Sequence, residues 1–265
     1  MLPIGTLLVL SAVAGLLGLD STGALQVMVS RPLIVGGIFG CLMGDTATGL
    51  AAGSLVEMLC MAGVPVGSLV VPDGTAAAAM AASVAISLAH ANPAHGSPAA
   101  AVALGVLAAV PAGAVGARAE VVQRVLTNRL SRRADAVLDA GGMPSLVGLL
   151  AAALGLAWLR GFLVCACCLA LGLPVLGWIL VHLPPEGIRA LHLCFWLFWL
   201  LGMAVASNHF WDRRGLKYAA AAALVLAVFG TQFDSSQFSV LAALVAVALA
   251  AGWWRWTGAR RGELA

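Results

Sequence analysis

Three acidic residues stand alone in a long apolar stretch and are the first candidates for chemistry. Between positions 32 and 117 the only charged residues are Asp45, Glu57 and Asp73. An ionisable side chain inside a membrane segment is costly unless it is paired or solvated, so its presence indicates function. Glu57 lies deep within an apolar run, with no turn residues around it. It is expected either to bind a polar ligand or to fix helix packing by a hydrogen bond.

Asp73 and Asp45 both stand beside residues that favour helix ends. Asp73 follows Pro72 and precedes a strongly helix-forming run at 76–88, which predicts that its carboxylate caps that helix. Transporters also place substrates at the starts of interrupted membrane helices, so a binding role is compatible with capping. Asp45 occurs in the sequence Gly-Asp-Thr-Ala-Thr-Gly at 44–49, which favours a turn residue.

The pattern of nucleophiles and metal ligands argues against an enzyme. His90 and His95 flank an Asn-Pro turn and are expected in a loop, and no histidines form an i, i+4 pair. The six cysteines lie in apolar runs without the spacing of a zinc site. Neither a Gly-x-Ser-x-Gly elbow nor a nucleotide-binding loop occurs. We therefore expect transport of a solute, with no catalytic residue, metal or cofactor in this chain.

Composition identifies the elements that must position these acids as membrane helices. The chain has 265 residues, of which 62% are hydrophobic and 9% charged, whereas a soluble domain carries roughly 25% charged residues. We expect an all-α polytopic membrane protein with roughly seven to nine segments at about 20 residues each. The first of them, at 2–19, has no basic region before it and is expected to be retained. The net charge of +3 is too small and scattered to indicate nucleic-acid binding.

Charge and glycine spacing divide this single membrane domain, 1–265, into three parts. The glycine-rich half at 2–117 has acids only 12 and 16 residues apart, which favours interrupted or re-entrant helices. Glycines recur there every fourth residue, which favours close helix packing. The arginine-rich segment at 118–145 is expected to be cytoplasmic. The second membrane half, 146–265, has apolar runs at 146–159, 161–183, 188–211, 216–233 and 237–256. Arg160 is expected to separate a half-helix from a span.

The stretch at 26–79 resembles a known family. It contains, in order, Ser-Arg-Pro-Leu at 30–33, Gly-Asp-x-x-Thr-Gly at 44–49, Gly-x-x-x-Glu at 53–57 and Pro-Asp at 72–73. This ordered set is similar to the membrane component IIC of the mannose/fructose/sorbose family of the bacterial sugar phosphotransferase system. The similarity is looser at 142–160, 183–187 and 202–208.

The resemblance implies a multi-pass sugar permease subunit of the bacterial inner membrane. Such a subunit pairs with a membrane subunit IID as a trimer of heterodimers and moves a hexose-type sugar inward. Cytoplasmic IIB, charged by IIA, phosphorylates that sugar, so the IIC chain is not catalytic alone. Glu57 and Asp73 would accept hydrogen bonds from sugar hydroxyls, with Gln26 and Asn208 as weaker neutral partners. Arg31 would neutralise an acid or anchor its helix at the interface. Structural or gating roles would fall to Asp45, Arg31, Gly44, Gly49, Gly67 and Pro72.

Three alternatives compete with this interpretation. An ion-coupled secondary transporter would use Asp45, Glu57 and Asp73 to bind protons or Na⁺, and it would take up its solute without partners. A membrane enzyme of lipid metabolism would need clustered Asp and His ligands, which this sequence lacks. A scaffold subunit that has lost transport would be indifferent to the substitution Glu57→Gln.

Overall fold

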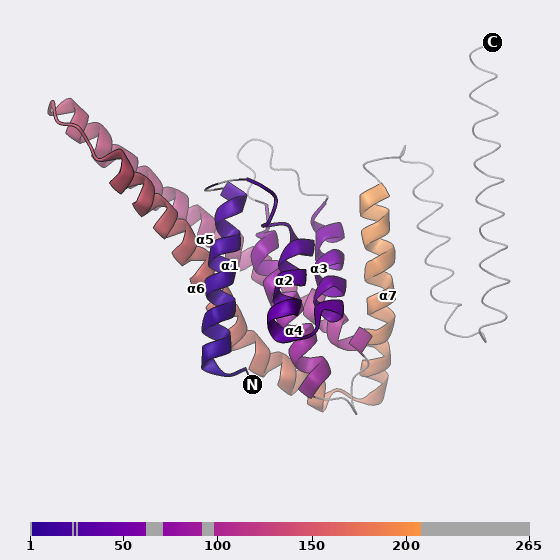
Figure 1. Cartoon of the computed structure of the whole chain (residues 1–265). Helices are drawn as coiled ribbons and strands as arrows, with labels where there is room; N and C mark the ends of the chain where they lie inside the picture. Colours follow the sequence, from indigo (N-terminus) through magenta and orange to yellow (C-terminus); the bar gives the residue numbers. More distant parts are fainter. Residues whose placement is uncertain (1, 23, 25, 62–70, 92–97, 208–265) are drawn as a thin grey trace, which may run out of the picture. The chain divides into compact units, whose positions relative to one another are not determined.

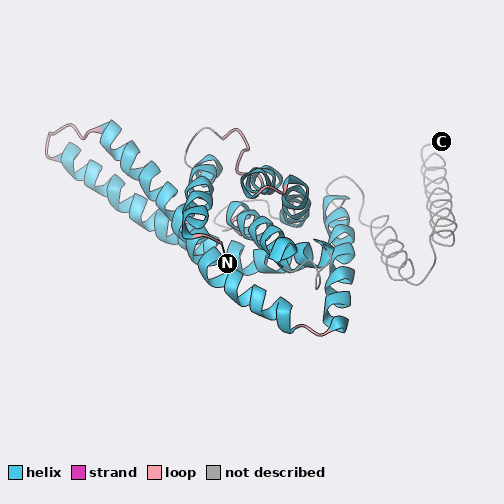
Figure 2. Cartoon of the chain, turned by 60° about the horizontal axis from the view of Figure 1, so that its bottom comes forward, coloured by secondary structure: helices cyan, strands magenta, loops and turns pink. Residues whose placement is uncertain are grey.

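The structure is entirely helical wherever it is described. The computed structural model describes residues 2–22, 24, 26–61, 71–91 and 98–207, and these ranges contain helices and connecting turns without a strand (Figure 2). Seven helices, α1 to α7, follow one another there. The chain divides into two compact units, Met1–Phe195 and Trp196–Ala265. The first unit holds α1 to α6 and the start of α7 (Pro185–Ser207), and it contains the acids of interest.

Within the described residues, four helices have the length and apolar composition needed to cross a membrane. They are α1 (Ile4–Thr22), α4 (Gly74–Ala91), α5 (Pro98–Asp139) and α6 (Leu146–His182). Two further apolar helices, α2 (Pro32–Met43) and α3 (Thr46–Cys60), are shorter. This arrangement confirms the predicted all-α polytopic membrane fold. The runs at 216–233 and 237–256 lie outside the described residues.

The short helices α2 and α3 form a tight hairpin. Gly44 ends α2 with φ +82°, a left-handed conformation that favours glycine, and Asp45 caps α3 by accepting a hydrogen bond from Thr48 N at 3.0 Å. A Cβ on Gly36 would lie 2.5 Å from the carbonyl oxygen of Gly49, so the helices touch through glycine. The 12 residues of α2 extend about 18 Å, well short of a hydrocarbon core of about 30 Å. Helix α2 is therefore too short to cross that core by itself.

Helix α4 is the central helix of this unit. Its residues 75–86 are buried without interruption, and it contacts α1, α2, α3, α5 and α6. Most of its side chains are alanines, so neighbouring backbones approach closely. A Cβ on Gly105 of α5, for example, would lie 2.5 Å from the carbonyl oxygen of Ala81. The many neighbours of α4 fix the position of Asp73, the residue just before it.

The long helices α5 and α6 pack together, and their connected ends extend beyond the other helices of this unit as a two-helix arm (Figure 1). We define the arm as residues 117–156, none of which is buried. A turn containing Gly141, with φ +75°, joins its two helices. All five arginines of the arginine-rich segment at 118–145 lie on the α5 half of the arm.

Two expectations about helix ends are wrong. Helix α6 runs without a break from Leu146 to His182, through Arg160. Arginine is a good helix former, and acids on other helices compensate its charge, so no interruption is needed. His90 does not lie in a loop. It lies in the last turn of α4, where its Nδ1 donates a hydrogen bond to Ile86 O at 2.8 Å. His95 lies outside the described residues.

Candidate functional site

The starts of α2 and α4 lie against each other and bring two of the predicted acids to the same end of the helices. Pro32 opens α2 and Gly74 opens α4, and a Cβ on Gly74 would lie 3.1 Å from Pro32 Cγ. Thr75 Oγ1 also donates a hydrogen bond to the carbonyl oxygen of Ser30 at 3.1 Å. Helix N-termini carry free N–H groups and a partial positive charge. This junction therefore favours anionic side chains.

Glu57 provides a carboxylate for the start of α2. It lies in the last turn of α3, where Oε1 accepts a hydrogen bond from Arg31 Nη1 at 3.1 Å and Oε2 accepts one from Leu33 N at 3.4 Å. The side chain of Glu57 is 17% exposed and that of Arg31 is 53% exposed. Of the two roles left open for Arg31, the geometry favours neutralisation of Glu57. The long sequence separation of this pair hides it from local pattern analysis.

Asp73 provides a carboxylate for the start of α4. Its Oδ1 accepts a hydrogen bond from Ala76 N at 3.1 Å, which is the expected capping bond, and its own N–H donates to Gly113 O at 3.0 Å. Helix α5 presses directly on this side chain. A Cβ on Gly116 would lie 2.5 Å from Asp73 Cβ and 2.9 Å from Oδ2. The carboxylate is thus held between its own helix and α5.

A buried arginine completes the environment of Asp73. Arg160, in α6, places Nη2 3.7 Å from Asp73 Oδ2 and Nη1 3.4 Å from Glu120 Oε2. Its side chain is 5% exposed. Glu120 also pairs with Arg124, with Nη2 to Oε1 at 2.6 Å. Sequence reasoning missed both Arg160 and Glu120 as site residues, although a lone arginine within a 37-residue apolar helix is a signal in itself.

Asp20 is a further buried acid that sequence reasoning missed. It lies near the end of α1, and its carboxylate accepts hydrogen bonds from Val27 N at 2.6 Å and Ser30 N at 3.1 Å. It thereby holds the loop that leads into α2. Its position between two apolar segments, close to the family-like stretch, was the available signal.

In the described part of the chain, no hydrogen bond or ion pair joins the other predicted binding residues to Glu57 or Asp73. Gln26 is exposed in the loop before α2, with φ +50°. Asn208 and Gly67 lie outside the described residues. Pro72 packs on α5, because a Cβ on Gly113 would lie 3.4 Å from Pro72 Cβ.

Asp45 occupies the opposite end of the α2–α3 hairpin. Helix α3 begins after Asp45, while Glu57 is in its last turn, so about 18 Å of helix separates them. The Asp45 carboxylate is committed to the backbone N–H of Thr48, which is its own helix start. This acid caps a helix and does not share the junction of α2 and α4.

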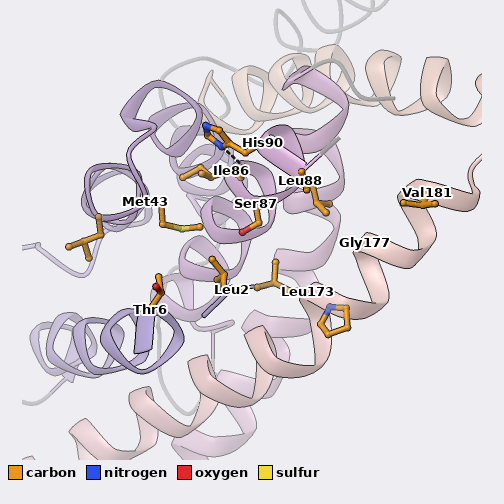
Figure 3. A pocket seen from close by; sticks show the side chains of 13 residues that line it. Leu2, Thr6, Met43, Ile86, Ser87, Leu88, His90, Leu173, Gly177 and Val181 are labelled. Carbon is orange, nitrogen blue, oxygen red and sulfur yellow. Dashed lines mark hydrogen bonds between the residues drawn. The ribbon is translucent and has the colours of Figure 1, made fainter. Parts of the chain in front are cut away.

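A cavity of about 750 Å³ lies at the ends of α2 and α4 that are opposite their junction (Figure 3). Its lining is mostly apolar and comes from the start of α1 and the later turns of α2, α4 and α6, with Thr6, Ser87 and His90 as its polar side chains. No aspartate or glutamate is among the residues that line it. This cavity is therefore separate from Glu57 and Asp73, and we place the candidate site on these two acids because carboxylates are unusual inside a membrane.

The junction can accept hydrogen bonds from a neutral polyhydroxylated solute. Each carboxylate oxygen has about two acceptor positions, and for Glu57 and Asp73 the recorded partners occupy one position on each oxygen. Hydrogen bonds to ionised groups are stronger than neutral ones. Within the described ranges no group of three His, Cys, Asp or Glu side chains could hold a metal ion.

Comparison with known proteins identifies curated relatives of part of this chain. The mannose-specific EIIC component of Escherichia coli (strain K12) is 26% identical over 116 residues, which cover 44% of this chain and 40% of that protein. The corresponding protein of Shigella flexneri matches to the same extent. The chain thus spans about two fifths of the length of the curated relatives it matches.

Solved structures and a family model extend the similarity over most of the chain. One solved chain, described as "Structure of membrane protein", has a TM-score of 0.58 at 23% identity and covers 92% of this chain and 93% of its own. A chain of "CryoEM Structure of Mannose Transporter ManYZ and Microcin E492 (MceA) complex" has a TM-score of 0.53 at 22% identity, with the same coverage. Both similarities show the fold. The family model for the PTS system sorbose-specific IIC component matches residues 4–251. The chain therefore belongs to this mannose/fructose/sorbose family of IIC components of the sugar phosphotransferase system.

Proposed function

We propose that this chain is the sugar-translocating subunit of its phosphotransferase system, binding a hexose-type sugar and releasing it inward for phosphorylation by IIB. The observation that carries this proposal is the junction of two helix starts, each bound by a carboxylate within an apolar helical unit. Mannose specificity is stated for the E. coli relative, which supports a hexose as substrate. The chain itself supplies no phosphoryl-transfer chemistry in this proposal.

In this proposal Glu57 and Asp73 accept hydrogen bonds from sugar hydroxyls. Arg31 and Arg160 orient the two acids, because each guanidinium lies within ion-pair distance of one of them. Gln26 and Asn208 act as weaker neutral partners. The same arginine pairing disfavours an ion-coupled transporter, since a cation would have to compete with an arginine for each carboxylate.

Transport requires the site to open to each side in turn. We assign the movement to the α2–α3 hairpin, which packs on itself through Gly36, Gly40, Gly49 and Gly53. Such a compact hairpin can shift as one body against α4. Structural or gating roles then fall to the residues at its ends and at the start of α4: Asp45, Arg31, Gly44, Gly49, Gly67 and Pro72.

The proposed complex is a trimer of IIC–IID heterodimers in the bacterial inner membrane, served by IIB and IIA. The arginines of the arm favour a cytoplasmic location for it. The arm begins at residue 117, directly beyond Gly116, which contacts Asp73. The carboxylates are therefore assigned to the cytoplasmic half of the helices, where a released sugar would meet IIB.

The test uses membranes that contain this chain together with its IID partner. Purified enzyme I, HPr, IIA and IIB are added with phosphoenolpyruvate, and phosphorylation of labelled mannose, fructose, sorbose and N-acetylgalactosamine is measured. We expect one of these sugars to be phosphorylated, and we expect Glu57→Gln or Asp73→Asn to abolish the reaction. If an assembled complex phosphorylates none of them, while the chain alone shows gradient-driven uptake, the ion-coupled alternative replaces this proposal.

A further inference from the structure

We propose that Arg160 is a positioning residue for sugar binding, which holds the Asp73 carboxylate in place while Glu120 holds Arg160. This inference rests on the proposed function, because it assumes that Asp73 contacts the sugar. It adds a residue that the sequence motifs of 26–79 do not contain and that lies 87 positions beyond Asp73 in the chain.

The location of Arg160 is the first observation. It is the only Lys, Arg, Asp or Glu residue in α6 (Leu146–His182), and its side chain is 5% exposed. Removing a guanidinium from water is costly unless it is paired and hydrogen-bonded. A charge retained at such a place must be compensated by nearby acids.

The geometry of its two acids is the second observation. Asp73 directly precedes α4 and Glu120 lies near the start of the arm on α5, so Arg160 joins three separate helices through one side chain. Two different nitrogens serve the two acids, Nη2 for Asp73 and Nη1 for Glu120. A planar guanidinium can do this with a fixed orientation, whereas a lysine has one nitrogen to offer.

The guanidinium is not saturated by these contacts. Among the described residues, Nε and Nη1 of Arg160 have no hydrogen-bond partner, and the Nη1–Glu120 contact at 3.4 Å is an ion pair only. A group used purely to tie helices together would be expected to make short, complete hydrogen bonds. The incomplete pairing leaves Arg160 able to follow the Asp73 carboxylate when a sugar takes up its free acceptor positions.

The consequence for Asp73 is a defined orientation of its carboxylate. Oδ1 is committed to the N–H of Ala76, so the direction of Oδ2 depends on what lies opposite it. With Arg160 present, that partner is a cation. Without Arg160, the cation that lies opposite Oδ2 is gone, and the carboxyl group can rotate away from its present direction. Rotation moves an acceptor away from a sugar hydroxyl.

The experiment measures KM and kcat for phosphoenolpyruvate-dependent phosphorylation of the substrate sugar in membranes containing the IIC–IID complex. The variants are Arg160→Gln and Arg160→Lys, with Arg129→Gln on the exposed arm as the matched control. We expect Arg160→Gln to raise KM by roughly 10- to 100-fold, the size of a lost hydrogen bond to an ionised group, with a much smaller change in kcat. Because Arg160→Lys keeps the positive charge on one nitrogen, it should raise KM less than Arg160→Gln does. The control should keep the wild-type KM.

A double-variant comparison separates positioning from a merely structural role. In an Asp73→Asn background, where phosphorylation is expected to be lost, the readout is equilibrium binding of the sugar to the purified IIC–IID complex. Adding Arg160→Gln there should change the affinity little, because the group that Arg160 positions is already gone. Independent effects of the two substitutions would indicate that Arg160 acts elsewhere, and would overturn the inference. If the Arg160→Gln variant fails to assemble with IID, Arg160→Lys decides the question, and a wild-type KM in that variant overturns the inference. A wild-type complex that phosphorylates no sugar instead overturns the proposed function, and this inference with it.

Discussion

Replacing Gly116 by alanine tests whether the position of the Asp73 carboxylate matters. The new Cβ would lie 2.5 Å from Asp73 Cβ, where ordinary contact begins near 3.4 Å, so the carboxylate or α5 must shift by about 0.9 Å. Overpacking of this kind costs about 1–3 kcal/mol, and the better helix propensity of alanine offsets about 1 kcal/mol of it. Stability should therefore fall only modestly. A displacement of about 1 Å at a binding group can reduce activity by about 100-fold. We therefore expect a large loss of sugar phosphorylation together with only a modest fall in the free energy of unfolding.

Gly113, one turn earlier on α5, provides the matched control. A Cβ there would lie 3.4 Å from Pro72 Cβ and 3.5 Å from Ala77 Cβ, which is ordinary contact, and alanine keeps the carbonyl that accepts the Asp73 N–H. Sugar phosphorylation by the assembled complex is the assay, normalised to the amount of IIC–IID in the membrane. We expect Gly113→Ala to retain activity and Gly116→Ala to lose it. Equal activity in the two variants would refute the assigned role of the Asp73 carboxylate position.

Two further substitutions test the supports of the site by the melting temperature of the purified complex. Gly49→Ala should lower the melting temperature, because the added Cβ would meet Gly36 O and cost about 1–3 kcal/mol. Gly5→Ala is the control and should leave the melting temperature unchanged, because a Cβ on Gly5 would have no atom within 4 Å. A melting temperature unchanged by Gly49→Ala would contradict close packing of α2 on α3. Asp20→Asn should also lower the melting temperature, since the amide keeps only one acceptor oxygen for the two loop N–H groups. Ser21→Ala, which removes only a bond to the carbonyl of its own helix, is its control, and an equal effect of both would contradict the loop-holding role.

Local sequence signals predicted the parts of the fold that depend on neighbours in the chain. The recurrence of glycine at every fourth residue predicted close packing of helices, which the contacts of Gly36 and Gly49 confirm. The residues around Asp73 predicted a helix start, which the bond from Ala76 N confirms. Composition alone was enough for the helical membrane class. Each of these signals lies within a few residues of the feature it describes.

The charge pairs of the site could not be predicted in the same way. Arg160 meets Asp73 and Glu120 across 87 and 40 positions of sequence, and no periodicity connects residues so far apart. In the local sequence, an arginine between two apolar runs resembles the boundary of a membrane segment. For this reason a break at Arg160 was predicted, and the prediction was wrong. Asp73, just before α4, and Glu120, on α5, come to compensate the charge of Arg160 only when the helices pack. The choice between the two roles of Arg31 likewise depended on where Glu57 lies.

Direct binding of the sugar tests the central claim that Glu57 and Asp73 hold it. The measurement is equilibrium binding of the sugar that the complete system phosphorylates to the purified IIC–IID complex in the absence of phosphoenolpyruvate. The variants Glu57→Gln and Asp73→Asn are compared with Asp45→Asn, which alters a helix-capping acid at the other end of the hairpin. We expect the first two to weaken binding by roughly 10- to 100-fold each, and Asp45→Asn to leave it much less affected. Wild-type affinity in both Glu57→Gln and Asp73→Asn would contradict the claim.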